Sequence, residues 1–297
     1  MISASFYSCY PILSYYKGLF LNNERVNSIL LANNFKDLIE KINEIFSPYF
    51  VEGIKNDVDI DEIENQLRDN YFNVFNKLKH FFFGNIRNFS YIFNEFFNIR
   101  NYLREISQNN IKSKYVESLV QEFPDKELFY YESLLYNRYF SKTKQIFMEL
   151  DADNGCFNLL NDFIDFINLK IVINTAYSLN LKEEEIKSLL NYSGNSIILD
   201  NIARIIDLEF DEKLRKIQLL NNFEKDKNWE NYINLLINFK KLTLKKIGGN
   251  PFRYSFFYAF FLTLLTDYEI LIIILNFYKL ELNKDNLKTI LLEYSDV

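Results

Sequence analysis

The sequence predicts an all-α protein built from repeated helical units. Glycine and proline are rare, with seven Gly and four Pro in 297 residues. Folds rich in tight turns need more of both, so this scarcity favours long helices with few breaks. Apolar residues recur at helical spacing, and no long stretch alternates with the two-residue period of a strand. The segment 165–190 also recurs at 266–291, which indicates one helical unit used more than once.

The two copies of this segment align without a gap. A fainter third copy begins at 95–106. We therefore expect one continuous helical unit over 1–297, in which each repeat covers part of its neighbour's core. The approximate repeats are 12–110, 111–195 and 196–297. The identical pairs are Ile171 and Ile272, Ile173 and Ile274, Tyr177 and Tyr278, Leu179 and Leu280, Leu181 and Leu282, Lys187 and Lys288, and Leu190 and Leu291.

The first helices follow from apolar spacing and capping residues. Asn22 or Asn23 is placed to cap the second helix. Pro48 ends the third, which carries apolar residues at helical spacing. Asp59 or Asp61 is placed to cap the fourth, which runs through Ile63, Leu67, Tyr71 and Leu78. We expect these helices at about 12–21, 24–31, 35–46 and 61–78.

The later helices follow in the same way. Pro124 and the glycine-containing run GGNP at 248–251 interrupt this part of the chain. We expect helices at about 89–106, 111–122, 126–150, 157–179, 183–191, 196–220, 228–245, 252–279 and 284–294.

Composition and charge exclude several classes of protein. With 48% hydrophobic residues the chain is able to bury a large core. The formal net charge is −6 with both signs spread along the chain, so we expect no nucleic-acid partner. Cys9 and Cys156 stand far apart, as expected of free thiols in a reducing compartment. Residues 1–18 lack the features of a signal peptide, and we expect a cytoplasmic location.

One segment resembles a membrane span in composition. Apolar runs at 256–265 and 270–275 are both shorter than the ~20 residues that a spanning helix needs. Asp267 and Glu269 would lie in the middle of a combined span at a cost of a few kcal/mol each. We therefore expect a helix buried within a bundle, in a protein peripheral to any membrane.

Candidate metal and catalytic motifs have simpler interpretations. The acidic run at 57–64 favours the dipole of a helix start, and DADNGC (151–156) departs from a calcium loop, so a turn between helices is expected. His80 lacks a nucleophile motif and is expected to be structural. The Gly pair at 248–249 lacks a phosphate-loop pattern. We expect no metal, no cofactor and no catalytic residue.

The repeats carry a polar pattern that needs partners. Asp165 and Asn168 lie one helical turn apart, as do Asn98 and Asn101, while the last copy has Asp267 and Glu269. Apolar residues surround these positions, so burial would require hydrogen bonds. We expect them to bond backbone where the chain crosses from one bundle to the next. A catalytic carboxylate–amide pair is the alternative interpretation.

Five motifs follow one another across nearly the whole chain. They are KGLFLNNERVNSILLANNFKDLIEKI (17–42), FFNIRNYLREI (96–106), FIDFINLKIVI (163–173), LKEEEIKSLLNYSGNSI (181–197) and GGNPFRYSFFYAFFLTLLTDYEILIIILNFYKLEL (248–282). In content and in order, this set resembles the central-stalk subunit that is designated C in the bacterial and archaeal V/A-type rotary ATPases and d in the eukaryotic membrane sector.

The resemblance implies three related helical bundles with pseudo-threefold repetition, arranged as a funnel. It also implies a non-catalytic rotor subunit, present as a single copy, on the cytoplasmic face of the membrane. Its partners would be the central-shaft subunits and the proteolipid ring, between which it would transmit torque for ATP-coupled ion transport.

Two other classes remain open at this point. The chain is also compatible with a helical-repeat scaffold that binds an unrelated protein. The other class is an all-α enzyme whose site combines dispersed residues, such as His80 with two carboxylates.

Overall fold

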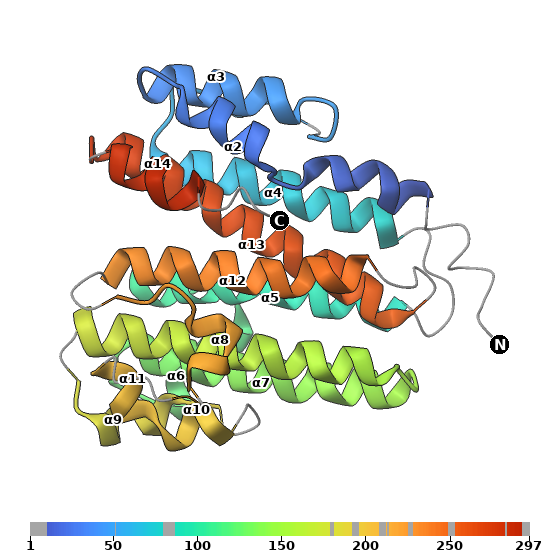
Figure 1. Ribbon diagram of the computed structural model, residues 1–297. Coiled ribbons are helices and arrows are strands. Elements are labelled where there is room, and N and C mark those ends of the chain that lie inside the picture. The colour runs from blue at the N-terminus through green and yellow to red at the C-terminus, as the bar shows by residue number, and fades with distance from the viewer. Residues whose placement is uncertain are drawn as a thin grey trace. The chain divides into compact units, whose positions relative to one another are not determined.

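The computed structural model confirms the all-α class (Figure 1). It describes residues 11–50, 52–79, 87–178, 181–191, 196–207, 212, 214–224, 228–248, 253–282 and 284–292. Within these ranges it contains thirteen α-helices and no strand. The pseudo-threefold arrangement of bundles stays a prediction. Outside the described residues lie Cys9, His80 and residues 249–251 of the GGNP run.

The chain divides into two compact units. The first joins residues 1–87 to 232–297, and the second is the intervening segment 88–231. The two ends of the sequence therefore build one unit, while its middle builds the other. The boundaries of these units differ from those of the three predicted repeats. The repeats themselves stay a prediction.

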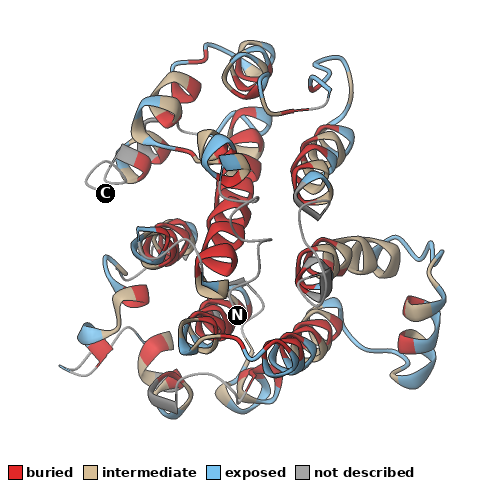
Figure 2. Ribbon diagram, turned by 90° about the vertical axis from the view of Figure 1, so that its right-hand side faces the viewer, coloured by how far each residue is buried: buried red, intermediate tan, exposed pale blue. Residues whose placement is uncertain are grey.

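The first unit is organised around one long apolar helix, α13 (Tyr254–Lys279). This helix contacts α3, α4 and α14. Every residue from Phe256 to Ile272 is buried, because α13 is apolar on all sides rather than along one stripe (Figure 2). The other elements of this unit are η1 (Lys17–Leu19), α2 (Asn23–Leu30), α3 (Phe35–Phe46), α4 (Ile60–Lys79), α12 (Asn228–Ile247, from residue 232 onward) and α14 (Lys284–Leu292).

Among the described helices, α13 is the one that is long and apolar enough to cross a membrane. Its apolar window is 94% buried inside the structure, so the same composition is accounted for by a core helix. The two apolar runs of the sequence are joined through Asp267 and Glu269, both of which lie inside this single helix.

The second unit packs around a pair of long helices, α7 and α8, with α9 in contact with both. Its core is aromatic: the Phe163 ring lies 5.7 Å from that of Phe96 and 5.5 Å from that of Phe140, the latter edge-to-face. The elements are α5 (Arg87–Ser107), α6 (Lys114–Glu122), α7 (Leu128–Glu149), α8 (Asn154–Ser178), α9 (Glu183–Leu189), α10 (Ser196–Asp200) and α11 (Ile202–Ile206), then η3 (Leu214–Lys216) and η4 (Gln218–Leu220).

The single helix predicted over 196–220 is wrong. The structure breaks this segment into α10, α11 and two short 3₁₀ turns. Asn201 lies at the first break, where its backbone carbonyl accepts the Ile205 N–H and its side chain accepts from Arg204. Asparagine favours such helix-start positions over helix interiors because its side chain competes for backbone hydrogen bonds. Apolar periodicity alone did not reveal this break.

Four described asparagines hold extended backbone against helices by the same pair of bonds. In each case the amide oxygen accepts the N–H of one residue, and the amide nitrogen donates to the C=O of that same residue. We call this arrangement a peptide clamp. Two of the clamped residues, Ile54 and Asn191, are buried, and peptide groups outside helices need such partners where water does not reach them. The clamps are Asn43 on Ile54, Asn70 on Glu52, Asn168 on Asn191, and Asn231 on Glu224, with donor–acceptor distances of 2.7–3.3 Å.

The Asn168 clamp yields a stability prediction. Replacing Asn168 by Ala leaves the N–H and C=O of Asn191 without the partners that hold them at 2.9 and 3.0 Å. Because Asn168 is 0% exposed and Asn191 is also buried, we expect a loss of roughly 2–4 kcal/mol in unfolding free energy. Urea unfolding followed by circular dichroism measures this loss. Asn174→Ala, an exposed position on the same helix, is the control and is expected to change stability by less than about 0.5 kcal/mol. Equal effects of the two variants would contradict the clamp's role.

Candidate functional site

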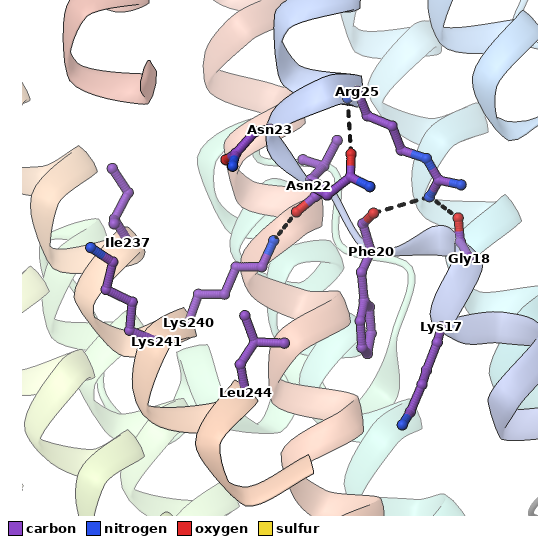
Figure 3. A pocket seen from close by; sticks show the side chains of 11 residues that line it. Lys17, Gly18, Phe20, Asn22, Asn23, Arg25, Ile237, Lys240, Lys241 and Leu244 are labelled. Atoms are coloured by element: carbon purple, nitrogen blue, oxygen red, sulfur yellow. Dashed lines mark hydrogen bonds between the residues drawn. The ribbon is translucent and has the colours of Figure 1, made fainter. Parts of the chain in front are cut away.

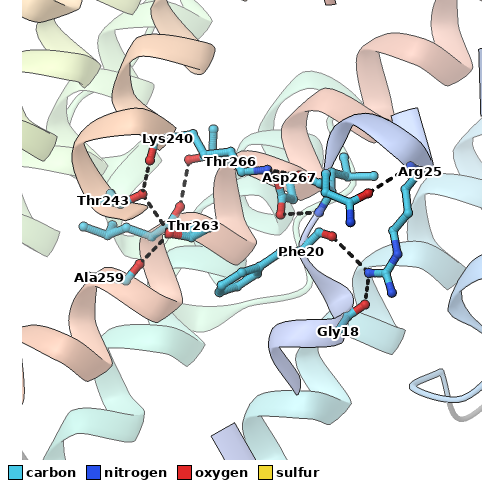
Figure 4. Close-up of polar contacts among 12 residues, drawn as sticks. Gly18, Phe20, Arg25, Lys240, Thr243, Ala259, Thr263, Thr266 and Asp267 are labelled. Atoms are coloured by element: carbon cyan, nitrogen blue, oxygen red, sulfur yellow. Dashed lines mark hydrogen bonds and ion pairs between the residues drawn. The ribbon is translucent and has the colours of Figure 1, made fainter. Parts of the chain in front are cut away.

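A buried ion pair lies at the centre of the first unit. Lys240 on α12 and Asp267 on α13 form it, with side chains 3% and 0% exposed. The Lys240 ammonium donates to Asp267 Oδ1 and to the C=O of Leu21. The Leu21 N–H donates to Asp267 Oδ2 at 2.9 Å (Figure 4). Two helices therefore hold one residue of the N-terminal segment by both of its peptide groups.

This ion pair is a charged version of the peptide clamp. An asparagine supplies both the acceptor and the donor, whereas here Asp267 accepts the Leu21 N–H and Lys240 donates to the Leu21 C=O. Leu21 lies between η1 and α2, so the clamp attaches the start of α2 to α12 and α13. The Lys240–Asp267 clamp thus connects segments more than two hundred residues apart in sequence.

Burial perturbs the ionisable groups around this clamp. Loss of solvation lowers the pKa of the Lys240 ammonium, while the Asp267 carboxylate opposes that shift. Burial, reinforced by the charge of Asp267, raises the pKa of the Tyr71 hydroxyl well above its ordinary value. Tyr71 therefore remains a neutral phenol beside the pair. Its hydroxyl has no hydrogen-bond partner within the described ranges.

The contact between α12 and α13 continues through hydroxyl groups. Thr243 Oγ1 and Thr263 Oγ1 lie 2.7 Å apart (Figure 4). Thr243 Oγ1 is also within hydrogen-bond distance of the C=O of Lys240, and Thr263 Oγ1 of that of Ala259. Each hydroxyl has one proton, so one threonine donates across to the other, which donates to the carbonyl of its own helix. This polar contact lies one turn along α12 from the Lys240–Asp267 clamp.

The N-terminal segment is shaped by local contacts. Asn22 Oδ1 accepts the Arg25 N–H at 2.9 Å and caps α2. The Arg25 side chain turns back and donates to the C=O groups of Gly18 and Phe20. Gly18 faces the Tyr49 ring so closely that an added Cβ would lie 1.7 Å from the Tyr49 hydroxyl oxygen. Glycine is therefore needed at this close approach unless the tyrosine moves.

A cavity of about 320 Å³ lies between the N-terminal segment and α12 (Figure 3). Four of the residues that line it are basic, and none carries a carboxylate. Lys17 and Arg25 stand on one side, and Lys240 and Lys241 come from α12 on the other. The remaining lining residues are Gly18, Phe20, Leu21, Asn22, Asn23, Ile237 and Leu244. The Lys240–Asp267 clamp forms part of this wall.

The six polar residues singled out in the sequence fall in both units. Asp165 and Asn168 are buried on α8, and Asn168 forms the clamp on Asn191. Asp267 and Glu269 are buried on α13, where Asp267 bonds the backbone of Leu21. The polar pair on α5 is half-buried, and consists of Asn98, which donates to Glu95 Oε2 at 3.5 Å, and Asn101.

The sequence interpretation of Lys240 is wrong. In the sequence, Lys240, Lys241, Lys245 and Lys246 form a basic run near the end of a helix, a pattern that predicts a solvated last turn matching the helix dipole, yet Lys240 is buried. The helical spacing of its neighbours could have indicated this burial. Leu236 and Thr243 lie one turn before and after Lys240, on the same buried face of α12. A basic residue on such a face needs a buried counter-charge.

The acidic run at 57–64 and the segment 151–156 have the local structures expected of them, while His80 and Gly249 lie outside the described residues. Asp59 Oδ1 accepts the Glu62 N–H at 2.8 Å and starts α4. Residues 151–153 form the turn between α7 and α8, residues 154–156 begin α8, and Asp153 Oδ1 accepts the Gly155 N–H at 3.0 Å. Cys156 is a buried free thiol. No group of three or more His, Cys, Asp or Glu suited to a metal occurs within the described ranges.

Comparison with known proteins does not assign the chain to a family. No protein-family model matches this chain, and no curated protein is significantly similar to it.

Charge pairing in the Lys240–Asp267 clamp is testable by a double-mutant cycle. Lys240→Met leaves a buried carboxylate without its counter-charge, and Asp267→Asn leaves a buried ammonium in the same state. Each is expected to cost about 3–5 kcal/mol in unfolding free energy. The double variant should be more stable than either single one, because the amide introduced at position 267 would then hold Leu21 as Asn168 holds Asn191.

The measurement is urea unfolding of all three variants and the parent protein. Lys241→Met, a half-buried neighbour on the same helix, serves as the matched control and should change stability by no more than about 0.5 kcal/mol. If the loss of unfolding free energy in the double variant equals the sum of the two single losses, the two charges are not coupled.

Proposed function

We propose that this chain is a non-catalytic central-stalk subunit of a V/A-type rotary ATPase. It would lie at the cytoplasmic face of the membrane, dock the central shaft onto the proteolipid ring, and transmit torque for ATP-coupled ion transport. The observation that carries the proposal is the ordered set of motifs similar to this central-stalk family, spread over nearly the whole of an all-helical chain.

Part of the hydrogen-bonded framework lies within those motifs, while Lys240 and the clamps of Asn43, Asn70 and Asn231 lie outside them. Leu21 belongs to the first motif, 17–42, and Asp267 to the last, 248–282. Asn168 belongs to the motif at 163–173, and the residue that it clamps, Asn191, to the motif at 181–197. The resemblance therefore includes positions with a defined structural role rather than only apolar residues at helical spacing.

The packing within each unit suits a part that transmits force. Aromatic rings interlock in the second unit, and peptide clamps attach extended segments to helices in both units. Close-packed interiors have low compressibility and transmit strain, so each unit is expected to resist deformation under load. Torque transmission requires this property and requires no nucleotide site in the same subunit.

An exposed apolar end of the first unit favours membership of an assembly. The Tyr278 hydroxyl donates to the backbone of Leu30 and Ala32, which ties the end of α13 to the end of α2. Leu31 and Leu280 flank these bonds and are 63% and 64% exposed, and Leu282 is also exposed. Apolar side chains grouped at a surface are typical of sites that contact other proteins.

The proposal predicts the companions of the native protein. Affinity isolation of the tagged chain from its own source, followed by mass spectrometry, is expected to recover shaft and ring subunits of one rotary ATPase. A tagged, abundant soluble helical protein from the same cells is the control and should recover neither. Recovery of a single unrelated partner would instead favour the helical-repeat scaffold, and absence of ATPase subunits would refute the rotor assignment.

A further inference from the structure

We propose that the cavity between the N-terminal segment and α12 binds a small phosphate-bearing ligand. This binding site goes beyond the rotor function and does not depend on it. It lies wholly within the first unit, because residues 17–25 and 237–244 both belong there. The proposal rests on the size of the cavity, the sign of the charges that line it, and its apolar wall.

The cavity has the dimensions of a site for a compact molecule. Its volume of about 320 Å³ is at the lower end of the roughly 300–1,000 Å³ that is usual for small-molecule sites. Phe20, Ile237 and Leu244 give it an apolar wall. A ligand that matches both size and lining has one phosphate group joined to a small organic body.

The charges around the cavity favour an anion. Lys17 and Arg25 stand across it from Lys241 (Figure 3). The carboxylate behind this wall belongs to Asp267, and its two oxygens already accept bonds from Lys240 and from the Leu21 N–H. Positive charge on both sides of a partly enclosed space raises the local concentration of anions.

Lys241 is the cation most available to a ligand. It is half-buried, and it makes no hydrogen bond or ion pair with another residue in the described part of the chain. Its neighbour Lys240 is committed to Asp267 and Leu21, so the two lysines differ although both line the cavity. A partly desolvated ammonium with three donors gains most from an anionic oxygen placed beside it.

Arg25 adds a positive charge on the opposite side. Its Nη1 is used by the C=O groups of Gly18 and Phe20, which hold the guanidinium in place. The guanidinium also lies 5.9 Å from the Phe46 ring centroid and 6.0 Å from that of Tyr49, so Arg25 contributes a fixed positive charge to this wall. Phosphate supplies several strong acceptor oxygens and up to two negative charges, which suits lysine and arginine placed on two sides.

Isothermal titration calorimetry of the purified full-length chain tests the proposal. The probes are phenyl phosphate, inorganic phosphate and, as the uncharged analogue, benzyl alcohol. The variant is Lys241→Ala, with Lys246→Ala as the matched control, because Lys246 is exposed on the same helix outside the cavity. We expect phenyl phosphate to bind more tightly than inorganic phosphate, and benzyl alcohol not to bind.

Lys241→Ala is expected to weaken phenyl phosphate binding about tenfold or more, and Lys246→Ala to leave it unchanged within about twofold. Absence of phosphate binding, or equal weakening by both variants, would overturn the proposal. Circular dichroism of each variant checks that the fold is intact. Because neither shaft nor ring is present, the result is independent of the rotor assignment.

A second arm distinguishes a free ligand from a lipid headgroup. Vesicles of phosphatidylcholine with and without phosphatidic acid are sedimented with the same variants. Lys241-dependent binding to the phosphatidic acid vesicles identifies a headgroup as the source of the phosphate, and Lys241-dependent binding of phenyl phosphate alone identifies a free metabolite. Vesicle binding that is equally strong in Lys241→Ala, without phenyl phosphate binding, would mean that the cavity is not the site.

Discussion

The structure depends on hydrogen-bond partners for peptide groups that lie outside helices, of which those of Leu21, Ile54 and Asn191 belong to buried residues. An unpartnered buried N–H or C=O costs about as much as a lost hydrogen bond, so an all-helical chain needs side chains to reach its buried connections. In this protein, side chains on neighbouring helices supply those hydrogen bonds. Asn43, Asn70, Asn168 and Asn231 each hold one residue by both peptide groups, and Lys240 with Asp267 does the same for Leu21.

The charged clamp differs from the others in what it specifies. An asparagine joins one helix to one loop, whereas Lys240 and Asp267 join two helices to a third segment and are satisfied only when all three are in register. A buried ion pair is weak evidence for net stability, because desolvating both charges is costly. What the ion pair adds is structural specificity. Because α13 is apolar on every side, apolar packing alone does not fix which of its residues face α12.

The Lys240–Asp267 clamp also fixes one wall of the cavity, because Leu21 and Lys240 both line it. Leu21 is held by the Lys240–Asp267 clamp, and Arg25 holds the backbone of Gly18 and Phe20 just before it. The walls of the cavity are therefore preformed rather than dependent on a ligand. A ligand bound there would be held by a rigid part of the first unit, so its binding would alter local charge more than shape.

The sequence alone determined the class of the fold and much of its core. Few glycines and prolines, together with helical apolar spacing, predicted long helices, and the apolar runs around residues 256–275 predicted one buried helix. Local spacing also indicated that Asn168 and Asp267 would need partners. The break at Asn201, the burial of Lys240 and the identity of Leu21 as its partner were decided only by the tertiary structure. Periodicity describes one helix at a time, whereas burial of a charge depends on which distant segment packs against it.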